Sequence, residues 1–380
     1  MSSGHLPHQR SSSASGPRAE SAAGDLAPRL APLASDRASS SAQVVLESSA
    51  VLRDWFAERA GESGLDGAEI ESGLARWADE QAWRGACALW LDSLRRAWRR
   101  VAGREEPVRG AALLAEEMDR WAQDDERDAE GELRERATRR TPASPEIPWN
   151  GEPLAPGRRL ASRTELASRA AQDLGPGETV LVTSWSETVA LSLETAWREG
   201  RRPEVLLVEG APDLDGRRMA RRLARSGIPV TMAYDSALVG LVPRADRVWL
   251  STEAIGAGLC LGRIGTLALL EECQRRDVPV RLLATSDKLV PGGELRLPSW
   301  SERETWRLWE DPPEGVRLEP QMFERVPIDR VELAGGFLSE HGRETAAVLH
   351  LRSLRVDAAP ACGAPRSRLR AGAATFDPRT

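Results

Sequence analysis

Short apolar segments alternate with helical patterns between residues 179 and 276, and this alternation constrains the fold more than any other feature. The apolar segments have the length of buried strands, and turns follow them. Strands that alternate with helices run parallel, because a helical crossover returns the chain to the edge where the previous strand began. Strands are expected at 179–183, 204–208, 230–234, 247–250 and 280–284. The pattern predicts an α/β domain built on a Rossmann-like parallel sheet.

The residues before this sheet have the apolar spacing of helices. Large apolar side chains recur at intervals of three and four over 44–61, 66–103 and 111–121, which predicts three amphipathic helices. Asp66 is the expected N-cap of the second helix. The tryptophans of this region lie on the apolar stripes, so we expect them in a packed core or a helix–helix interface rather than on a base-stacking surface. A helical domain is therefore expected to precede the α/β domain.

Composition sets the domain boundaries. Residues 1–43 are rich in Ser, Ala, Pro and Arg and have few large apolar side chains, so a disordered tail is expected there. The helical domain is expected at 44–140, and a Pro-rich linker at 141–157. The α/β domain is expected at 158–345 and begins with a helix that ends at Gly175 and Pro176. A partly disordered C-terminal extension is expected at 346–380.

Charge and cysteine usage argue against several classes of protein. The formal net charge is −6, so the molecule is not built to coat nucleic acid. No uninterrupted apolar run approaches the roughly 18 residues of a membrane-spanning helix. The four cysteines have no CxxC spacing and no histidine beside them, so neither a zinc site nor a disulfide framework is expected. We expect a cytoplasmic protein with no metal and no cofactor.

Two arginine clusters, at 95–100 and 217–222, are dense enough to contact a phosphate backbone. In both clusters the spacing places the arginines on one face of a helix, and acidic residues lie close in sequence. A solvated helix face is the favoured interpretation. A nucleic-acid or translation-associated role carried by these faces is the weaker alternative.

The loops after the expected strands carry polar residues and glycines in a definite order. Open α/β sheets bind ligands at the carboxyl ends of their strands, so these loops are the candidate site. The segments are Val182-Thr-Ser-Trp-Ser186, Val208-Glu-Gly-Ala-Pro212 with Gly216, Asp235-Ser-Ala237, Ser251-Thr-Glu-Ala-Ile255, Ala257-Gly258, Gly262-Arg-Ile-Gly-Thr266 and Ser286-Asp-Lys288. This order resembles the superfamily that joins methylthioribose-1-phosphate isomerase, ribose-1,5-bisphosphate isomerase and the alpha, beta and delta subunits of translation initiation factor 2B. The resemblance covers about residues 160–345 and implies a helical domain followed by an α/β domain.

The resemblance also implies where catalytic groups would lie. In the isomerases of this superfamily, a cysteine after the first strand and an aspartate after the fourth transfer protons between a C1-phosphorylated ribose and its ketose. The matching positions here are Trp185 and Glu253. Indole only donates hydrogen bonds and does not move protons, whereas Glu253 keeps the carboxylate. The pair that contacts phosphate, usually Asn-Lys, is Gly262-Arg263, and the acidic residue of the neighbouring loop is Leu259.

Glu253 is the single candidate for a catalytic residue. The residues expected to contact a ligand at the strand ends are Ser184, Trp185, Ser186, Glu209, Asp235, Gly258, Arg263, Gly265, Thr266 and Lys288. Arg263 precedes the start of a helix, where backbone amides and the helix dipole favour an anion. Arg263 and Lys288 follow neighbouring strands, so both are expected at one rim of the sheet.

Several of these residues have a structural alternative. Glu209 either binds a ligand or caps a helix or pairs with an arginine, and Glu253 is either functional or an ordinary loop carboxylate. For Asp235 the favoured interpretation is a helix N-cap, because Asp is a preferred cap residue. Trp185 either stacks on a base or a sugar face, or fills the space of the missing thiol and closes the site.

The sequence therefore predicts an initiation factor 2B-like pseudoenzyme, a non-catalytic protein that self-associates and binds a sugar phosphate or a nucleotide. Trp300, Trp306 and Trp309 surround a short segment with more aromatic surface than one small helix hides, which predicts a contact between copies of the chain. The alternative is an active aldose–ketose sugar-phosphate isomerase with altered catalytic groups.

Overall fold

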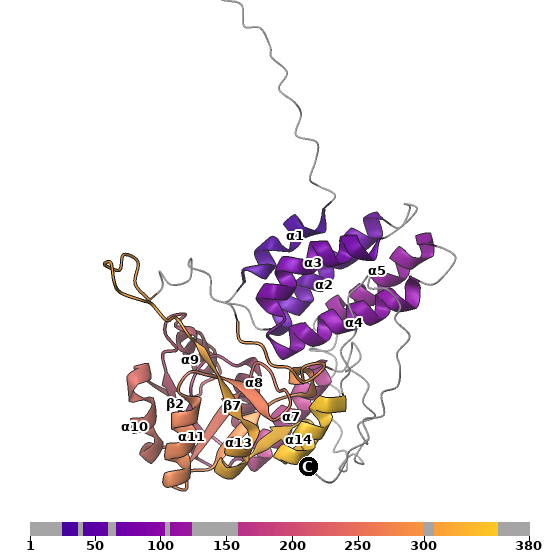
Figure 1. The fold of residues 1–380 in the computed structure, drawn as a ribbon. Helices are drawn as coiled ribbons and strands as arrows, with labels where there is room; N and C mark the ends of the chain where they lie inside the picture. The colour runs from indigo at the N-terminus through magenta and orange to yellow at the C-terminus, as the bar shows by residue number, and fades with distance from the viewer. Residues whose placement is uncertain are drawn as a thin grey trace, which may run out of the picture.

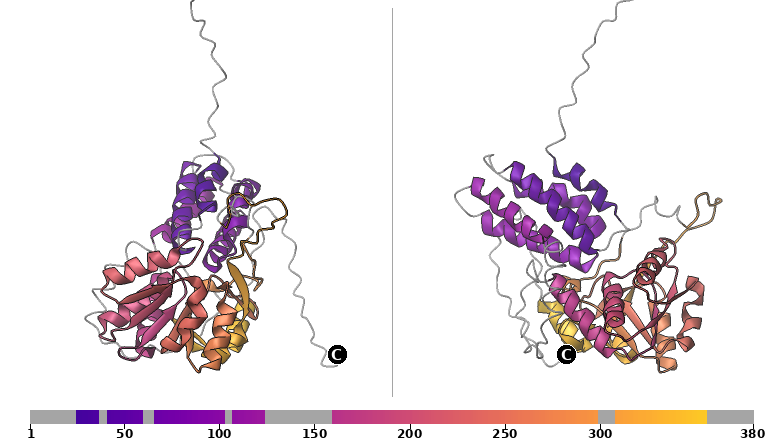
Figure 2. Two further views of the ribbon diagram at one scale, coloured as in Figure 1. Left: turned by 90° about the vertical axis from the view of Figure 1, so that its left-hand side faces the viewer. Right: turned by 180° about the vertical axis from the view of Figure 1, so that it is seen from behind.

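The computed structural model describes residues 25–36, 41–59, 66–102, 107–123, 159–298 and 308–355. A helical domain, in indigo and purple, stands against one end of an α/β domain, in magenta to yellow (Figure 1). The two further views in Figure 2 show the same arrangement. The predicted fold class, a helical domain followed by a Rossmann-like α/β domain, is confirmed. The predicted linker at 141–157 lies outside the described residues.

The described part of the helical domain consists of α1 (Leu26–Ala34), α2 (Ser41–Glu58), α3 (Gly67–Gln81), α4 (Gly85–Val101) and α5 (Pro107–Gln123). Its core is rich in tryptophan, as the apolar stripes predicted. Trp55, Trp77 and Trp90 are fully buried. The indole N–H groups of Trp77 and Trp90 donate to the Ser48 and Ser49 hydroxyls at 2.9 Å each. These bonds satisfy the polar edges of the rings, so the tryptophans act as core residues.

Two sequence expectations for this domain differ from the structure. Part of the expected disordered tail, Leu26–Ala34, forms helix α1, whose Leu26 and Leu30 are buried. The single helix expected at 66–103 is two helices, because the chain turns at residues 82–84 between α3 and α4. The predicted N-cap is confirmed, since the Asp66 carboxylate accepts the Ala68 amide at 3.0 Å.

The α/β domain contains a seven-stranded sheet in the order β3-β2-β1-β4-β6-β8-β9. The strands are β1 (Thr179–Val182), β2 (Glu204–Val208), β3 (Val230–Ala233), β4 (Arg247–Ser251), β6 (Val280–Leu283), β8 (Phe337–Ser339) and β9 (Gly342–Glu344). All neighbouring pairs are parallel except β8 and β9. The five expected strands are thus confirmed, and the switch in strand order falls between β1 and β4.

Helices cover both faces of this sheet (Figure 1). They are α7 (Arg159–Asp173), α8 (Glu187–Arg198), α9 (Asp215–Arg225), α10 (Leu238–Leu241), α11 (Thr266–Arg275), α13 (Ile328–Ala334) and α14 (Ala346–Arg355), with single turns η2 (Asp235–Ala237), η3 (Val242–Arg244) and η4 (Ser286–Lys288). Val180 and Val182 of β1 pack toward α7, α8 and α9, whereas Leu181 packs toward α10, α11 and α13. Successive side chains of a strand point to opposite faces, so a continuous apolar run buries both.

A two-stranded antiparallel sheet, which the sequence did not predict, lies beside the large one. Its strands are β5 (Leu259–Arg263) and β7 (Phe323–Pro327). The segment expected as a loop before α11 is therefore mostly strand. Strand β5 ends at Arg263 and is followed directly by α11, so it fixes the position of that arginine at the strand ends of the large sheet.

The helical domain contacts the α/β domain at the carboxyl ends of the strands. The Gly85 amide, at the start of α4, donates to the Glu253 carbonyl at 2.7 Å. The Lys288 ammonium donates to the Ser41 hydroxyl at 3.0 Å. A Cβ at Gly85 would lie 2.4 Å from the Lys288 carbonyl oxygen, so only glycine permits this approach. The helical domain thereby forms one wall of the space above the sheet. Within the described residues, no helix is both long and apolar enough to cross a bilayer.

Candidate ligand-binding site

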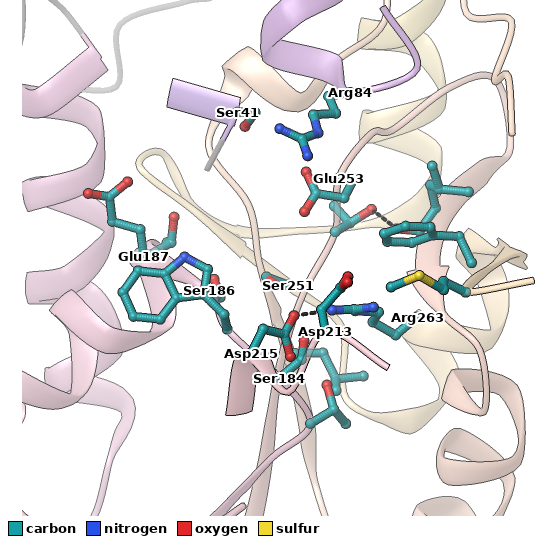
Figure 3. Close-up of a pocket in the computed structure, with 18 of the residues that line it drawn as sticks. Ser41, Arg84, Ser184, Ser186, Glu187, Asp213, Asp215, Ser251, Glu253 and Arg263 are labelled. Atoms are coloured by element: carbon teal, nitrogen blue, oxygen red, sulfur yellow. Dashed lines mark hydrogen bonds and ion pairs between the residues drawn. The ribbon is translucent and has the colours of Figure 1, made fainter. Parts of the chain in front are cut away.

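A cavity of about 820 Å³ lies between the two domains at the carboxyl ends of the strands. Its floor comes from the loops after β1, β2, β4 and β6, and its roof includes Ser41, Trp83 and Arg84 of the helical domain. Figure 3 shows Arg84 and Ser41 above the sheet loops that carry Ser184, Ser251 and Glu253. The position agrees with the rule that open α/β sheets bind ligands beyond the strand ends, next to the switch in strand order. Its volume is in the range of small-molecule sites.

Trp185 forms part of the wall of this cavity. Its ring is partly buried against the core formed by α7, α8 and α9. The Arg218 guanidinium carbon lies 3.9 Å from the ring centroid, a cation–π distance. The indole N–H is buried and has no hydrogen-bond acceptor among the described residues. A cavity remains beside the ring.

Arg263 is held by a carboxylate that the sequence did not single out. Its guanidinium forms an ion pair with Asp215, at the start of α9 (Figure 3). Burial raises the pKa of Asp215, and the charge of Arg263 opposes this effect without cancelling it. The arginine expected to grip phosphate is therefore already partnered, and a carboxylate lies beside it in the cavity.

Glu253, the catalytic candidate, lies in the cavity beneath the helical domain. Burial alone would raise its pKa, but the charges of Lys288, Arg84 and Arg263 hold the pKa below its usual value. The Lys288 ammonium is 3.6 Å from the nearer carboxylate oxygen, which is an ion pair but too long for a good hydrogen bond. Figure 3 shows the Arg84 guanidinium directed toward this carboxylate. Glu253 is thus kept ionised by cations from both domains.

The cavity as a whole is balanced in charge. Six cationic side chains line it, namely Arg84, Arg163, Arg218, Arg221, Arg263 and Lys288. Six acidic ones do so too, namely Asp36, Glu187, Asp213, Asp215, Glu253 and Asp287. Arg221, on α9, is exposed and has no charge partner within the part of the chain that the structure describes. A site of this kind suits a ligand with both an anionic group and hydroxyl groups, because carboxylates accept hydrogen bonds from hydroxyls.

Seven of the predicted residues line this cavity: Ser184, Trp185, Ser186, Glu253, Arg263, Thr266 and Lys288. The Ser186 hydroxyl also serves as the N-cap of α8, since it accepts the Val189 amide at 3.3 Å. The Thr266 hydroxyl donates to the Arg263 carbonyl at 2.6 Å. The expected anion position at the start of α11 is occupied by the protein itself, because the Glu324 carboxylate accepts the Leu267 amide at 3.0 Å.

Two predicted residues, Glu209 and Gly258, line neither this cavity nor the smaller one beside it. Glu209 forms a 2.9 Å ion pair with Arg217 on α9, which is the pairing role left open by the sequence. Gly258 has φ +79° and its carbonyl accepts the Ile328 amide at 3.1 Å, so it shapes the turn before β5. Neither residue lines the cavity at the strand ends.

Asp235 and Gly265 line a second, smaller cavity next to the first. The Asp235 carboxylate is not a helix N-cap. It accepts the Gly210 and Ala211 amides, at 2.9 and 2.7 Å, and so holds the loop after β2 against the loop after β3. Ser184 and Arg263 line both cavities.

Residues from distant parts of the chain complete the first cavity, and local patterns do not reveal them. Arg84 and Ser41 come from the helical domain, and Asp215 lies between the motif residues Pro212 and Gly216. Arg218 and Arg221 belong to an arginine cluster interpreted as a solvated helix face. That interpretation fits Arg217, which is exposed, whereas Arg222 is partly buried and pairs with Glu194 at 2.8 Å. The signal available in the sequence was the i, i+3 spacing of Arg218 and Arg221, which places both on one face of α9.

The three cysteines that the structure describes lie outside the cavity wall. Cys260 lies in β5 with its side chain in the core, and burial raises the pKa of its thiol to about 12. Cys87 and Cys273 are also buried. No cysteine is among the described residues that line the first cavity. Cys362 lies outside the described residues.

The sequence of this chain is similar to that of known proteins over part of its length. Residues 157–304 match the model of the initiation factor 2 subunit family. The ribose 1,5-bisphosphate isomerase of Haloferax volcanii is 30% identical over 132 residues, which are 34% of this chain and 41% of that protein. The match thus spans about two fifths of the length of this relative.

Solved structures agree at the level of the fold. The translation initiation factor eIF-2B of Pyrococcus horikoshii OT3 has a TM-score of 0.56 at 19% identity, with 84% of this chain and 96% of that chain covered. The tetrameric eIF2B-beta2-delta2 complex from C. thermophilum has a TM-score of 0.56 at 16% identity, with 86% and 93% covered. Together with the family match, these findings agree with the resemblance indicated by the strand-end motifs: residues 157–304 are similar to the initiation factor 2 subunit family and to ribose 1,5-bisphosphate isomerase, and the fold is similar to that of initiation factor 2B subunits.

Proposed function

We propose that this chain is a non-catalytic, cytoplasmic member of its superfamily that binds a phosphorylated sugar or a nucleotide in the cavity between its domains. The observation that carries the proposal is the cavity of about 820 Å³ whose wall has Trp185 at the position of the isomerase thiol. The space for a ligand is kept, whereas the group that would move protons is replaced by one that cannot.

The charges of the cavity favour this ligand class. The hydroxyl groups of a sugar can donate to the carboxylates of Asp215 and Glu253, which face the same cavity. A phosphate group requires cations, and an arginine binds it with two hydrogen bonds. Arg263 and Arg221 would supply these cations, the first from the end of β5 and the second from the rim at α9.

A thermal-shift screen of sugar phosphates and nucleotides is expected to find a ligand, since a compound that binds the native state raises the melting temperature by mass action. Replacing Arg263 by Ala should then weaken that ligand about 10- to 100-fold, because a charged hydrogen bond is lost and the Asp215 carboxylate is left to repel the anion. Arg263→Lys should retain part of the affinity. Titration calorimetry measures each dissociation constant.

A matched pair on α9 controls this experiment. Arg221→Ala should weaken the ligand, whereas Arg225→Ala, four residues along the same helix and outside the cavity, should not. If Arg263→Ala binds the ligand as tightly as the parent, the phosphate-binding role is wrong. If no anionic compound binds the parent, the binding proposal itself falls.

One observation favours a second candidate, an isomerase with altered catalytic groups. The pKa of Asp215 is raised, chiefly by burial, while the pKa of Glu253 is lowered by the cations around it. Two carboxylates whose pKa values are pushed apart in one cavity can act as an acid and a base. The turnover experiment that opens the Discussion separates this candidate from the non-catalytic one.

We propose further that the chain self-associates through the C-terminal half of the α/β domain. Trp309 is about half exposed, and Leu333, Val348 and Leu351 are exposed on α13 and α14. These two helices contact each other, so the leucines and the valine belong to one region of the surface. Exposed clusters of large apolar side chains are typical of protein interfaces. Trp300 and Trp306 lie outside the described residues.

Light scattering at micromolar concentration is expected to give at least twice the monomer mass of 41.5 kDa. Leu333→Glu combined with Leu351→Glu should shift the chain toward monomer, because two charges would be buried without partners at the contact. Leu297→Glu, an exposed leucine far from α13 in sequence, serves as the control. A monomeric parent would contradict the proposal.

A further inference from the structure

The second cavity, of about 580 Å³, has a different character from the first. It lies at the carboxyl ends of β1, β2 and β3, between α10, the start of α11 and the segment 319–322. Most of its wall is apolar and comes from Val208, Leu214, Leu238, Val239, Ile264 and Leu308. Its volume matches a small-molecule site, in which apolar walls bury the ligand and a few polar groups orient it.

Large apolar side chains on this wall are left open to solvent. Val239 is 39% exposed, Ile264 is 54% exposed and Leu308 is 59% exposed. They come from three separate segments, namely α10, the turn before α11 and the loop that projects from the α/β domain (Figure 1). Covering apolar surface is favourable by about 25 cal/mol per Å². An apolar ligand group placed among these side chains would therefore be bound favourably, because it would cover apolar surface that is exposed in the fold.

The two cavities are adjacent. Six residues line both, including Ser184, Leu214 and Arg263. Arg263 lines both cavities, and its partner Asp215 lines the first. One molecule can therefore place an anionic or hydroxylated part in the first cavity and an apolar part in the second. A separate ligand for the second cavity would have to share Arg263 with the first.

We propose that the second cavity is an apolar subsite, and that the ligand carries an aromatic or aliphatic group attached to its phosphorylated, hydroxylated part. The occupant is the apolar end of that small molecule, because Ser184 and Arg263 line both cavities and so bring the subsite next to the first cavity. The second half of this proposal rests on the proposed function. The existence of an apolar subsite does not.

Anilinonaphthalene sulfonate tests the subsite by itself, because it joins an apolar ring system to one anionic group and fluoresces when its rings leave water. The full chain should bind it, with enhanced fluorescence. Ala268 lies on the exposed side of α11 and lines the subsite. Ala268→Trp should weaken binding about 10-fold or more, because the indole would occupy the space in which the probe makes its apolar contacts.

Gln274→Trp is the matched control, because it adds the same ring to the exposed side of the same helix away from both cavities. It should leave binding unchanged. Val239→Asp should weaken binding as Ala268→Trp does, although it leaves the cavity open, because it places a charge in the wall. Equal binding to the parent, Ala268→Trp and Val239→Asp would overturn the subsite.

A matched pair of ligands tests whether the two cavities hold one molecule. Benzyl riboside 5-phosphate should bind about 10-fold tighter than ribose 5-phosphate, because the benzyl group buries apolar surface that the parent sugar lacks. Ala268→Trp should abolish this difference and leave ribose 5-phosphate unaffected. If both compounds bind equally while the fluorescent probe responds as expected, the subsite stands and the single-ligand proposal is wrong. If neither of these phosphates binds and the thermal-shift screen finds no other anionic ligand, the proposed function fails, and the probe still decides the subsite.

Discussion

Purified chain incubated with methylthioribose 1-phosphate or ribose 1,5-bisphosphate is expected to leave both compounds unconverted. The reaction needs a group that gives and takes protons, and removing such a group typically lowers a rate by about 10²–10⁴. Trp185 is the residue that the resemblance places at the thiol position, and it lines the cavity, where its indole N–H can only donate. Phosphorus NMR of the reaction mixture measures the ketose product directly, with a ribose 1,5-bisphosphate isomerase as the positive control.

The buried cysteines do not replace the missing thiol. Burial raises the pKa of Cys260 to about 12, and its side chain lies in the core beneath the cavity rather than in its wall. At neutral pH a thiol of that pKa is ionised in only roughly one molecule in 10⁵. Cys260→Ser is therefore expected to leave ligand binding unchanged.

Turnover at an ordinary enzymatic rate would contradict the non-catalytic proposal and favour the isomerase. The residues responsible would then be identified by Asp215→Asn and Glu253→Gln. Asp215 has the raised pKa expected of a general acid, and Glu253 has the lowered pKa expected of an ionised base. Loss of activity in both variants, with a pH–rate profile that changes in Asp215→Asn, would assign these roles.

The parallel sheet could be predicted from the sequence because its central strands β1, β2, β4 and β6 bury both faces. Val180, Leu181 and Val182 are all buried, and such runs between helical patterns have few other interpretations. The strand-end loops followed from the same pattern. The tryptophan core followed from the helical spacing, because a ring on an apolar stripe must face the interior.

Features that depend on distant partners could not be predicted in this way. Strand β5 is defined by its pairing with β7, which begins 60 residues after Arg263 at Phe323, and its short sequence Leu-Cys-Leu-Gly-Arg has no strand signal of its own. Asp215 is an ordinary acidic residue at the start of a helix until β5 brings Arg263 beside it. Arg84 reaches the cavity only because the helical domain sits on the sheet.

Helix α1 shows how packing overrides composition. Its segment is rich in Ala and Pro, as in a disordered chain, but Leu26 and Leu30 lie one turn apart and are buried. Leu26 packs over Gly73 of α3, where a Cβ would lie 2.7 Å from the Leu26 Cβ. The absence of a side chain at Gly73 lets the two helices approach, and the helix gains its stability from that contact rather than from its own propensity.

Replacing Asp173 by Ala is expected to lower the free energy of unfolding by about 3 kcal/mol, because it leaves the buried Arg281 without its anion. The Asp173 carboxylate, at the end of α7, accepts hydrogen bonds from Arg247 of β4 at 2.7 Å and Arg281 of β6 at 2.9 Å. It also pairs with Arg343 of β9. Arg281 is 6% exposed, so removal of its partner leaves a charge in the protein interior.

The pH dependence of this effect follows from the pKa of the carboxylate. Burial alone would raise the pKa of Asp173, but the hydrogen bond from Arg343 and the charges of Arg281 and Arg247 hold it below its usual value. The unfolded chain then takes up this proton at a higher pH than the folded chain. The stabilisation is therefore complete at neutral pH and is lost as the pH falls below about 4 and through the folded-state pKa.

Urea unfolding of the parent and of Asp173→Ala at pH 7 and at pH 3 measures both the loss of stability and its dependence on pH. The two proteins should differ by about 3 kcal/mol at neutral pH, and the difference should shrink at the lower pH. Glu271→Ala, which removes an exposed carboxylate from α11, controls for the loss of one negative charge and should change stability by less than about 0.5 kcal/mol. An Asp173→Ala variant as stable as the parent at pH 7 would show that solvent already screens the three arginines, and that α7 is held to the sheet by its apolar face alone.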